Sequence, residues 1–131
     1  MAVVLDACAI TSLLENGPGA GTVEGILRHA GDEGKPCFMS VLNWGEVFYH
    51  AVRLSGRAEA ELTMDRLSAM PIRLVDADLA LARDAALLKA RGGLSYADCF
   101  AAALAKREGA ELVTGDREFK AVEKEIRIRW I

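Results

Sequence analysis

The pattern that most constrains the fold is a series of short apolar segments that lie too far apart along the chain to pair as hairpins. Four of these segments are short apolar runs typical of strands and cover residues 3–5, 37–39, 72–75 and 112–114. The fifth, residues 126–131, largely alternates apolar and basic residues, as an edge strand with one solvent-exposed face does. Helical spacing occurs between them, at residues 7–15, 22–30, from Ser40 to about 54, 58–70, 77–89 and 95–107. Strands joined through helices run parallel by right-handed crossovers. We therefore expect an α/β fold, a three-layer α/β/α sandwich around a parallel sheet of about five strands.

The composition agrees with a single domain over residues 1–131. With 52% hydrophobic and 27% charged residues, the chain is apolar enough to bury a core. No apolar run approaches the ~20 residues of a membrane span, and Asp6 interrupts the N-terminal apolar segment too early for a leader peptide. We expect a cytoplasmic protein with no membrane contact.

Two candidate site residues, Asp6 and Asp116, follow expected strands. Asp6 comes directly after residues 3–5, and Asp116 follows residues 112–114 with one glycine between. Ligands of an open parallel sheet bind outside the carboxyl ends of its strands, so both side chains can emerge at the same edge. Each residue could equally be the N-cap of the helix that follows it.

Two more acids, Glu46 and Asp98, lie near the starts of helices. Counting 100° per residue, Glu46 falls with Asn43 and His50 on the side opposite the apolar face of its helix, where an ordinary solvated glutamate would also lie. Asp98 has capping-box spacing from Ser95, which could explain it alone. The helix that Asp98 opens is nevertheless so apolar that its carboxylate would lose solvent, and a nearby cation would offset that cost.

Four carboxylates around one edge of a sheet repel one another unless they are protonated or bind a metal ion. Oxygen ligands favour Mg²⁺ or Mn²⁺, which suit phosphoester hydrolysis. A zinc site is not expected, because the two histidines are far apart and the three cysteines contain no C-x-x-C pair.

The segments around these acids resemble the PIN domain family, and the small size of the chain is similar to the VapC-type toxins of prokaryotic toxin-antitoxin pairs. The resemblance rests on four ordered blocks that cover essentially the whole chain, namely VVLDACAIT, MSVLNWGEVFY, LSYADCFAAALA and LVTGDREF. It implies strand order 3-2-1-4-5, which places Asp6 beside Asp116. It also implies a metal-dependent endoribonuclease that uses Mg²⁺ or Mn²⁺.

The same resemblance implies roles for individual residues. Asp6 and Asp98 match direct metal ligands, Glu46 completes the acidic cluster, and Asp116 helps to hold the ion or a second one. Thr114 matches the hydroxyl position of the T-G-D block. Cys8 departs from the family pattern, which often has Ser, Thr or Asn there. Thr11 or Ser12, about one turn on, could orient the site instead.

The resemblance further implies an RNA substrate and a small DNA-binding antitoxin whose tail occupies the active groove. We also expect a homodimer. Apolar helix faces that carry Trp44, Phe48 and Tyr49 could supply its interface, although core packing explains them as well.

The formal net charge of −3, from 16 basic and 19 acidic residues, at first argues against a nucleic-acid partner. Without the four candidate acids, 15 acidic residues (19 − 4) remain against 16 basic ones, so the rest of the chain carries +1 (16 − 15). Lys89, Arg91 or Arg117 could then steer RNA phosphates, although solvated helix ends explain them too.

Two other functions remain open. One is a catalytically silent PIN-like module that acts through protein contacts, against which the presence of all four acids argues. The other is an Asp-based phosphatase or receiver domain that uses Asp6 as phosphate acceptor. Neither Ala7 nor Cys8 supplies the second acid that a phosphatase of that kind needs.

Overall fold

The computed structural model describes all of residues 1–131 and contains strands and helices that alternate along most of the chain. The strands are β1 (Val3–Leu5), β2 (Cys37–Ser40), β3 (Ile72–Val75), β4 (Glu111–Thr114) and β5 (Arg127–Trp130). The α-helices are α1 (Ala7–Leu14), α2 (Ala20–Glu33), α3 (Val41–Ser55), α4 (Arg57–Ser68), α5 (Leu79–Arg91) and α6 (Tyr96–Glu108). A 3₁₀ helix, η1 (Arg117–Val122), precedes the last strand.

The five strands form one sheet in the order β3-β2-β1-β4-β5, and every neighbouring pair is parallel. The predicted fold class and strand order are therefore confirmed. In the centre of the sheet, Val4 of β1 pairs with Leu112 of β4, and Leu5 pairs with Val113. Because this register aligns the carboxyl ends of β1 and β4, the residues that follow the two strands emerge side by side.

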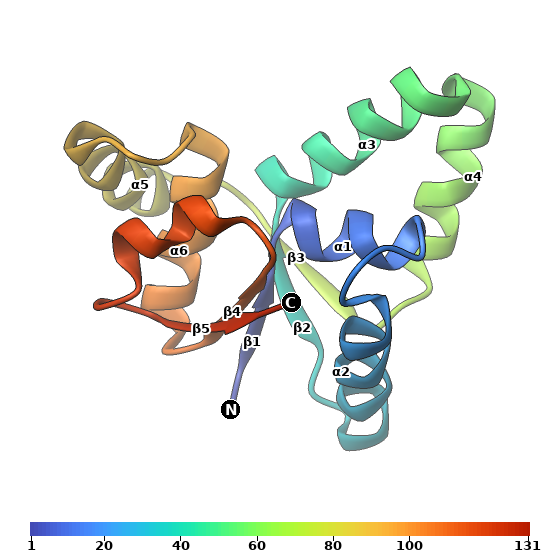
Figure 1. Cartoon of the computed structure of the whole chain (residues 1–131), viewed down its shortest axis with the longest axis horizontal. Helices are drawn as coiled ribbons and strands as arrows, with labels where there is room; N and C mark the ends of the chain where they lie inside the picture. The colour runs from blue at the N-terminus through green and yellow to red at the C-terminus, as the bar shows by residue number, and fades with distance from the viewer.

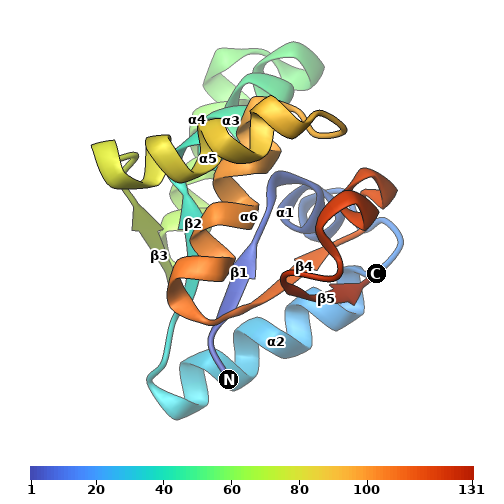
Figure 2. The ribbon, with the colours of Figure 1, turned by 90° about the vertical axis from the view of Figure 1, so that its left-hand side faces the viewer.

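Helices cover both faces of the sheet (Figures 1 and 2). On one face, α5, α6 and η1 bury a core that includes Leu81, Phe100 and Phe119. On the other face, α1, α2, α3 and α4 bury a second core around Ile10, Val23 and Val47. The sheet contributes to both cores because its side chains alternate between faces. No helix is long and apolar enough to cross a membrane.

Several helix boundaries differ from the sequence predictions by two or three residues, among them those of α2 and α5. Helix α2 begins at Ala20 instead of residue 22 and continues past residue 30, until Gly34 adopts the left-handed conformation (φ 64°) that ends it. Helix α5 begins at Leu79 instead of residue 77, because the Asp78 side chain accepts a hydrogen bond from the Leu81 N–H and acts as the N-cap.

The aromatic residues of α3 divide between core and surface. Trp44 and Phe48 are half-buried and pack against the core on the α1/α2 face, with their ring centroids 5.4 Å apart. Tyr49 is exposed, and the Arg53 guanidinium lies 4.9 Å from the centre of its ring. Of the three, Tyr49 therefore offers the most exposed side chain for contact with another molecule.

Candidate active site

Asp6 and Thr114 join the ends of the two central strands. Asp6 is the N-cap of α1, because its Oδ1 accepts a hydrogen bond from the Ala9 N–H at 2.8 Å. Its Oδ2 accepts a hydrogen bond from the Thr114 hydroxyl at 2.5 Å. Asp6 is 1% exposed and Thr114 is completely buried. The capping role and the position at the strand ends, which appeared as alternatives in the sequence, are thus both realised.

Asp116 extends this arrangement from the β4 side. Its N–H donates to the Thr114 Oγ1 at 3.0 Å, and its own Oδ1 accepts from the Glu118 N–H at 2.9 Å at the start of η1. One carboxylate oxygen each of Asp98, Asp116 and Glu118 lies within 4.8 Å of the others. Two of the predicted site residues therefore meet at this edge of the sheet.

Glu118 was missed by the sequence prediction. The only sequence feature that could have indicated Glu118 as a site residue is its position two residues after Asp116. Its carboxylate turns toward the site because of the short 3₁₀ helix that begins at Arg117. That turn brings its carboxylate back to Asp98, which lies 20 residues earlier in the chain.

Asp98 and Glu46 come from the starts of two different helices. The Asp98 N–H donates to the Ser95 hydroxyl at 3.2 Å, so Ser95 caps α6 as its spacing indicates. Glu46 lies on α3, where its Oε1 accepts a hydrogen bond from the side-chain amide of Asn43 at 2.9 Å. Asn43 is completely buried against the start of α6, whereas His50, further along the same side of α3, is exposed.

The acids are close enough to change one another's protonation. Burial raises the pKa of Asp6 to about 7, and the charges of Asp98 and Asp116 add to this rise while hydrogen bonds from Thr114 and Ala9 oppose it. Burial likewise raises the pKa of Asp98 to about 6, with a hydrogen bond from Ser95 opposing this rise and the charges of Asp116, Glu46 and Glu118 adding to it. All five acids thus belong to one electrostatic cluster.

This cluster has the chemistry of a site for a hard divalent cation. None of Asp6, Glu46, Asp98, Asp116 and Glu118 forms an ion pair with a lysine, arginine or histidine. Every candidate ligand atom is a carboxylate oxygen, the type that Mg²⁺ and Mn²⁺ prefer. A cation here would offset both the burial of these carboxylates and the repulsion between them, which together raise the pKa values of Asp6 and Asp98.

Cys8 lies at the border of the cluster. A Cβ placed on Gly115 would lie 3.3 Å from the Cys8 Sγ, so the thiol packs directly against the loop between Thr114 and Asp116. Burial raises the pKa of Cys8, and the charges of Asp6, Asp116 and Asp98 raise it further. Thr11 instead lines a cavity of about 150 Å³ between α1, α3 and α4. Cys8 therefore contacts the loop that carries Asp116, whereas Thr11 faces this cavity.

Each of the three cations expected to steer RNA contacts a neighbouring group in the protein. Lys89 donates to the Leu94 carbonyl at 2.9 Å, and Arg91 forms two hydrogen bonds with Glu125. The Arg117 guanidinium lies 4.7 Å from the centre of the Trp130 ring. Of the three, only Arg91 is paired with a carboxylate, whereas Lys89 and Arg117 form no ion pair.

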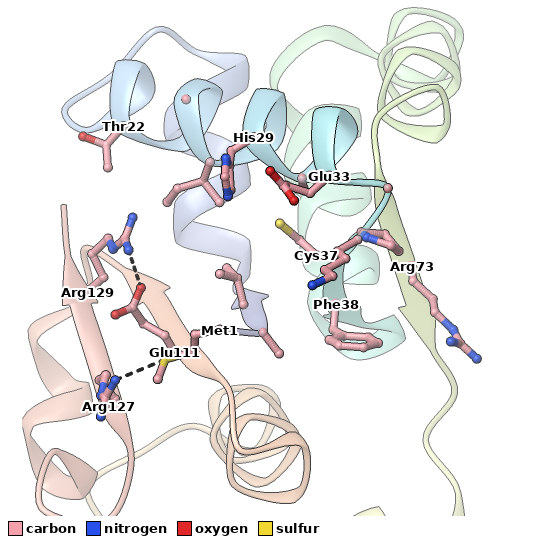
Figure 3. Close-up of a pocket in the computed structure, with 18 of the residues that line it drawn as sticks. Met1, Thr22, His29, Glu33, Cys37, Phe38, Arg73, Glu111, Arg127 and Arg129 are labelled. Atoms are coloured by element: carbon pink, nitrogen blue, oxygen red, sulfur yellow. Dashed lines mark hydrogen bonds and ion pairs between the residues drawn. The ribbon is translucent and has the colours of Figure 1, made fainter.

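Cationic side chains gather instead in a groove of about 1160 Å³ at the amino ends of the strands, where α2 faces β1 and β5 (Figure 3). Arg129 forms an ion pair with Glu111 at 2.8 Å in this groove, and Arg127 donates to the Met1 sulfur. The groove therefore lies at the opposite edge of the sheet from the acids.

The fold and the acidic cluster together define a parallel α/β protein with a candidate cation site at the carboxyl ends of its central strands. The model of the PIN domain family matches residues 3–125. The chain therefore belongs to the PIN domain family.

Solved structures share this fold. VapBC2 from Rickettsia felis, bound to a DNA fragment from its promoter, matches with a TM-score of 0.81 and 15% identity over 100% of this chain and 99% of that chain. DNA-bound VapBC from Salmonella typhimurium matches with a TM-score of 0.74 and 19% identity over 98% and 97%. The toxin VapC20 from Mycobacterium tuberculosis, described as cleaving the sarcin-ricin loop, matches with a TM-score of 0.69 and 16% identity over 92% and 95%. No curated protein matches this chain in sequence.

Proposed function

We propose that this protein is a metal-dependent endoribonuclease and the toxin of a type II toxin-antitoxin pair. The observation that carries the proposal is the convergence of Asp98, Asp116 and Glu118 beside Asp6 in a chain of the PIN domain family. The description of VapC20 as a toxin that cleaves the sarcin-ricin loop supports RNA as the substrate class.

The proposed metal site comprises the four acids predicted from the sequence, Asp6, Glu46, Asp98 and Asp116, together with Glu118. Asp98, Asp116 and Glu118 would hold Mg²⁺ or Mn²⁺ most directly, because their oxygens are mutually close. Thr114 orients Asp6 through its hydroxyl and orients Asp116 through the Asp116 N–H. A bound divalent ion would supply Lewis-acid chemistry for phosphodiester hydrolysis.

The burial of Asp6 disfavours the phosphatase or receiver alternative. A phosphate acceptor needs a carboxylate oxygen that can reach the substrate, but both oxygens of Asp6 accept hydrogen bonds within the protein and the residue is 1% exposed. The silent-module alternative is disfavoured because a domain without catalysis has no use for acids held close against their repulsion.

We also propose a cognate antitoxin as partner, supported by the VapBC complexes among the structures of the same fold. Its tail would cover the acidic cluster. A pull-down from the native host should recover a small DNA-binding protein, and recovery of no such protein would count against this partner.

We propose a homodimer as well, with exposed Tyr49 as one candidate contact. Light scattering should return twice the mass of the chain, and the mass of a single chain would count against the homodimer.

Cleavage of RNA with and without metal tests the enzymatic proposal. We expect cleavage with Mg²⁺ or Mn²⁺ that EDTA abolishes. Asp98→Asn and Glu118→Gln should each lower the rate at least about tenfold, because each removes a charged ligand. Glu123→Gln is the matched control, since Glu123 is exposed and forms no ion pair. Unchanged cleavage in both site variants, or cleavage that persists in EDTA, would refute a metal-dependent mechanism at these acids.

A further inference from the structure

Asn43 of α3 is a buried polar residue that contacts the acidic cluster without belonging to it. Its side chain is completely buried, and its Nδ2 donates to the Glu46 Oε1 at 2.9 Å. The same Nδ2 donates to the Ala97 carbonyl at 3.4 Å. Because Ala97 directly precedes Asp98, one amide group links the carboxylate of α3 to the start of α6.

The other end of this amide has no partner. Asn43 Oδ1 is the one buried side-chain N or O atom without a hydrogen bond in the protein. Rotating the amide by half a turn would not satisfy it, because Oδ1 would then face two acceptor oxygens. The observed orientation is therefore the one that serves Glu46 and Ala97. A buried acceptor without a donor lowers stability, so the residue is poorly explained by stability alone.

We infer that Asn43 is a positioning residue that holds the Glu46 carboxylate in the acidic cluster against repulsion from Asp98. This inference rests on the proposed function. Glu46 has a long side chain with several rotatable bonds, and its negative charge faces that of Asp98. The hydrogen bond from Asn43 removes much of the freedom with which Glu46 could turn away. The bond to Ala97 ties that constraint to the helix that carries Asp98.

The metal-free protein offers the first test, by NMR of the side-chain NH₂ groups. We expect the most downfield NH₂ proton of Asn43 to move upfield in Glu46→Gln, because the charged acceptor is lost. Asn16, which is exposed, serves as the internal control and should not move. An Asn43 signal that is the same in both proteins would overturn the inference, whatever the protein does with metal.

The second test is Mn²⁺ affinity, measured by titration calorimetry on the whole chain. Asn43→Leu keeps the branching of the side chain and removes both the donor and the unpartnered oxygen. We expect it to weaken Mn²⁺ binding about tenfold, in the range for lost orienting contacts around a metal. Thr63→Val, which removes a hydroxyl from α4, should bind like the wild type. Asn43→Ala replaces Asn43→Leu if the larger side chain prevents folding.

A double-mutant comparison separates positioning from other roles. If Asn43 acts through Glu46, Asn43→Leu should cause no further loss of Mn²⁺ affinity in the Glu46→Gln background. A further loss of similar size in that background would overturn the inference, as would wild-type affinity in Asn43→Leu alone. Failure of the wild type to bind Mn²⁺, with the NMR shift present, would instead contradict the proposed function and leave the contact between Asn43 and Glu46 established.

Discussion

The hydroxyl of Thr114 donates a hydrogen bond to the carboxylate of Asp6, which lies 108 residues earlier in the chain. The same hydroxyl oxygen accepts a hydrogen bond from the Asp116 N–H. A single buried side chain therefore holds the ends of β1 and β4 in register and sets the positions of two acids.

Replacing Thr114 with valine should destabilise the protein. The variant keeps the shape of the side chain but leaves Asp6 Oδ2 and the Asp116 N–H without this partner. We expect a loss of about 1–3 kcal/mol in the free energy of unfolding, measured by urea denaturation at neutral pH. Thr22→Val is the control, because Thr22 is exposed on α2. Equal stability of the two variants would contradict a structural role for the Thr114 hydroxyl.

The stability of the metal-free protein should fall as pH rises from about 4 to about 7. The pKa is raised from 3.8 to about 7 for Asp6 and to about 6 for Asp98, so in this range the folded state binds more protons than the unfolded state. The stabilisation from these protons is complete below the unfolded pKa and is lost as pH passes the folded values. Melting temperatures in EDTA across this range measure the slope.

Asp98→Asn isolates the cause of that pH dependence. Removing one buried charge should make the slope shallower and should raise the melting temperature of the metal-free protein at pH 7.5, because Asp6 then has one repelling neighbour fewer. Mg²⁺ should stabilise the wild type at pH 7.5 more than this variant. A melting temperature that rises with pH in EDTA would refute the electrostatic account.

Gly115→Ala and Gly25→Ala should change stability in opposite directions. A Cβ on Gly115 would lie 3.2 Å from the Ile131 carbonyl oxygen and 3.3 Å from the Cys8 Sγ, so the loop would have to shift, at a cost of about 1 kcal/mol or more. A Cβ on Gly25 meets nothing within 4 Å inside α2, so alanine there should gain about 0.5–1 kcal/mol from helix propensity. Urea denaturation of both variants checks the pair, and a stabilising Gly115→Ala would contradict the close packing of this loop.

Cys8 should react slowly with iodoacetamide at pH 7.5 and faster when Mg²⁺ is present. The thiolate is the reactive form, and burial with the nearby acids raises the pKa of this thiol. A cation in the acidic cluster would neutralise those charges and lower the pKa again. Mass spectrometry would follow the rate, with Cys8→Ser as the control because Cys37 and Cys99 are buried. A rate that Mg²⁺ leaves unchanged would argue against an ion beside Cys8.

The order and type of the strands and helices could be read from local patterns. Short β-branched runs separated by long helices exclude hairpins, and the polar caps Ser40 and Ser95 mark helix starts that the structure retains. These signals are local, because a cap or an apolar face acts within a few residues. The errors at α2 and α5 are also local, since a glycine in the left-handed conformation and an alternative cap moved the boundaries.

The contacts within the site could not be predicted from such local sequence patterns. Asp6, Asp98 and Asp116 could be proposed because the resemblance and the strand ends marked them, but the fully buried state of Asn43 and the approach of Glu118 to Asp98 could not. Both depend on how α3, α6 and η1 pack around the edge of the sheet. Local chemistry along a chain dictates where helices and strands form, whereas distances between side chains on different elements arise only when those elements pack together.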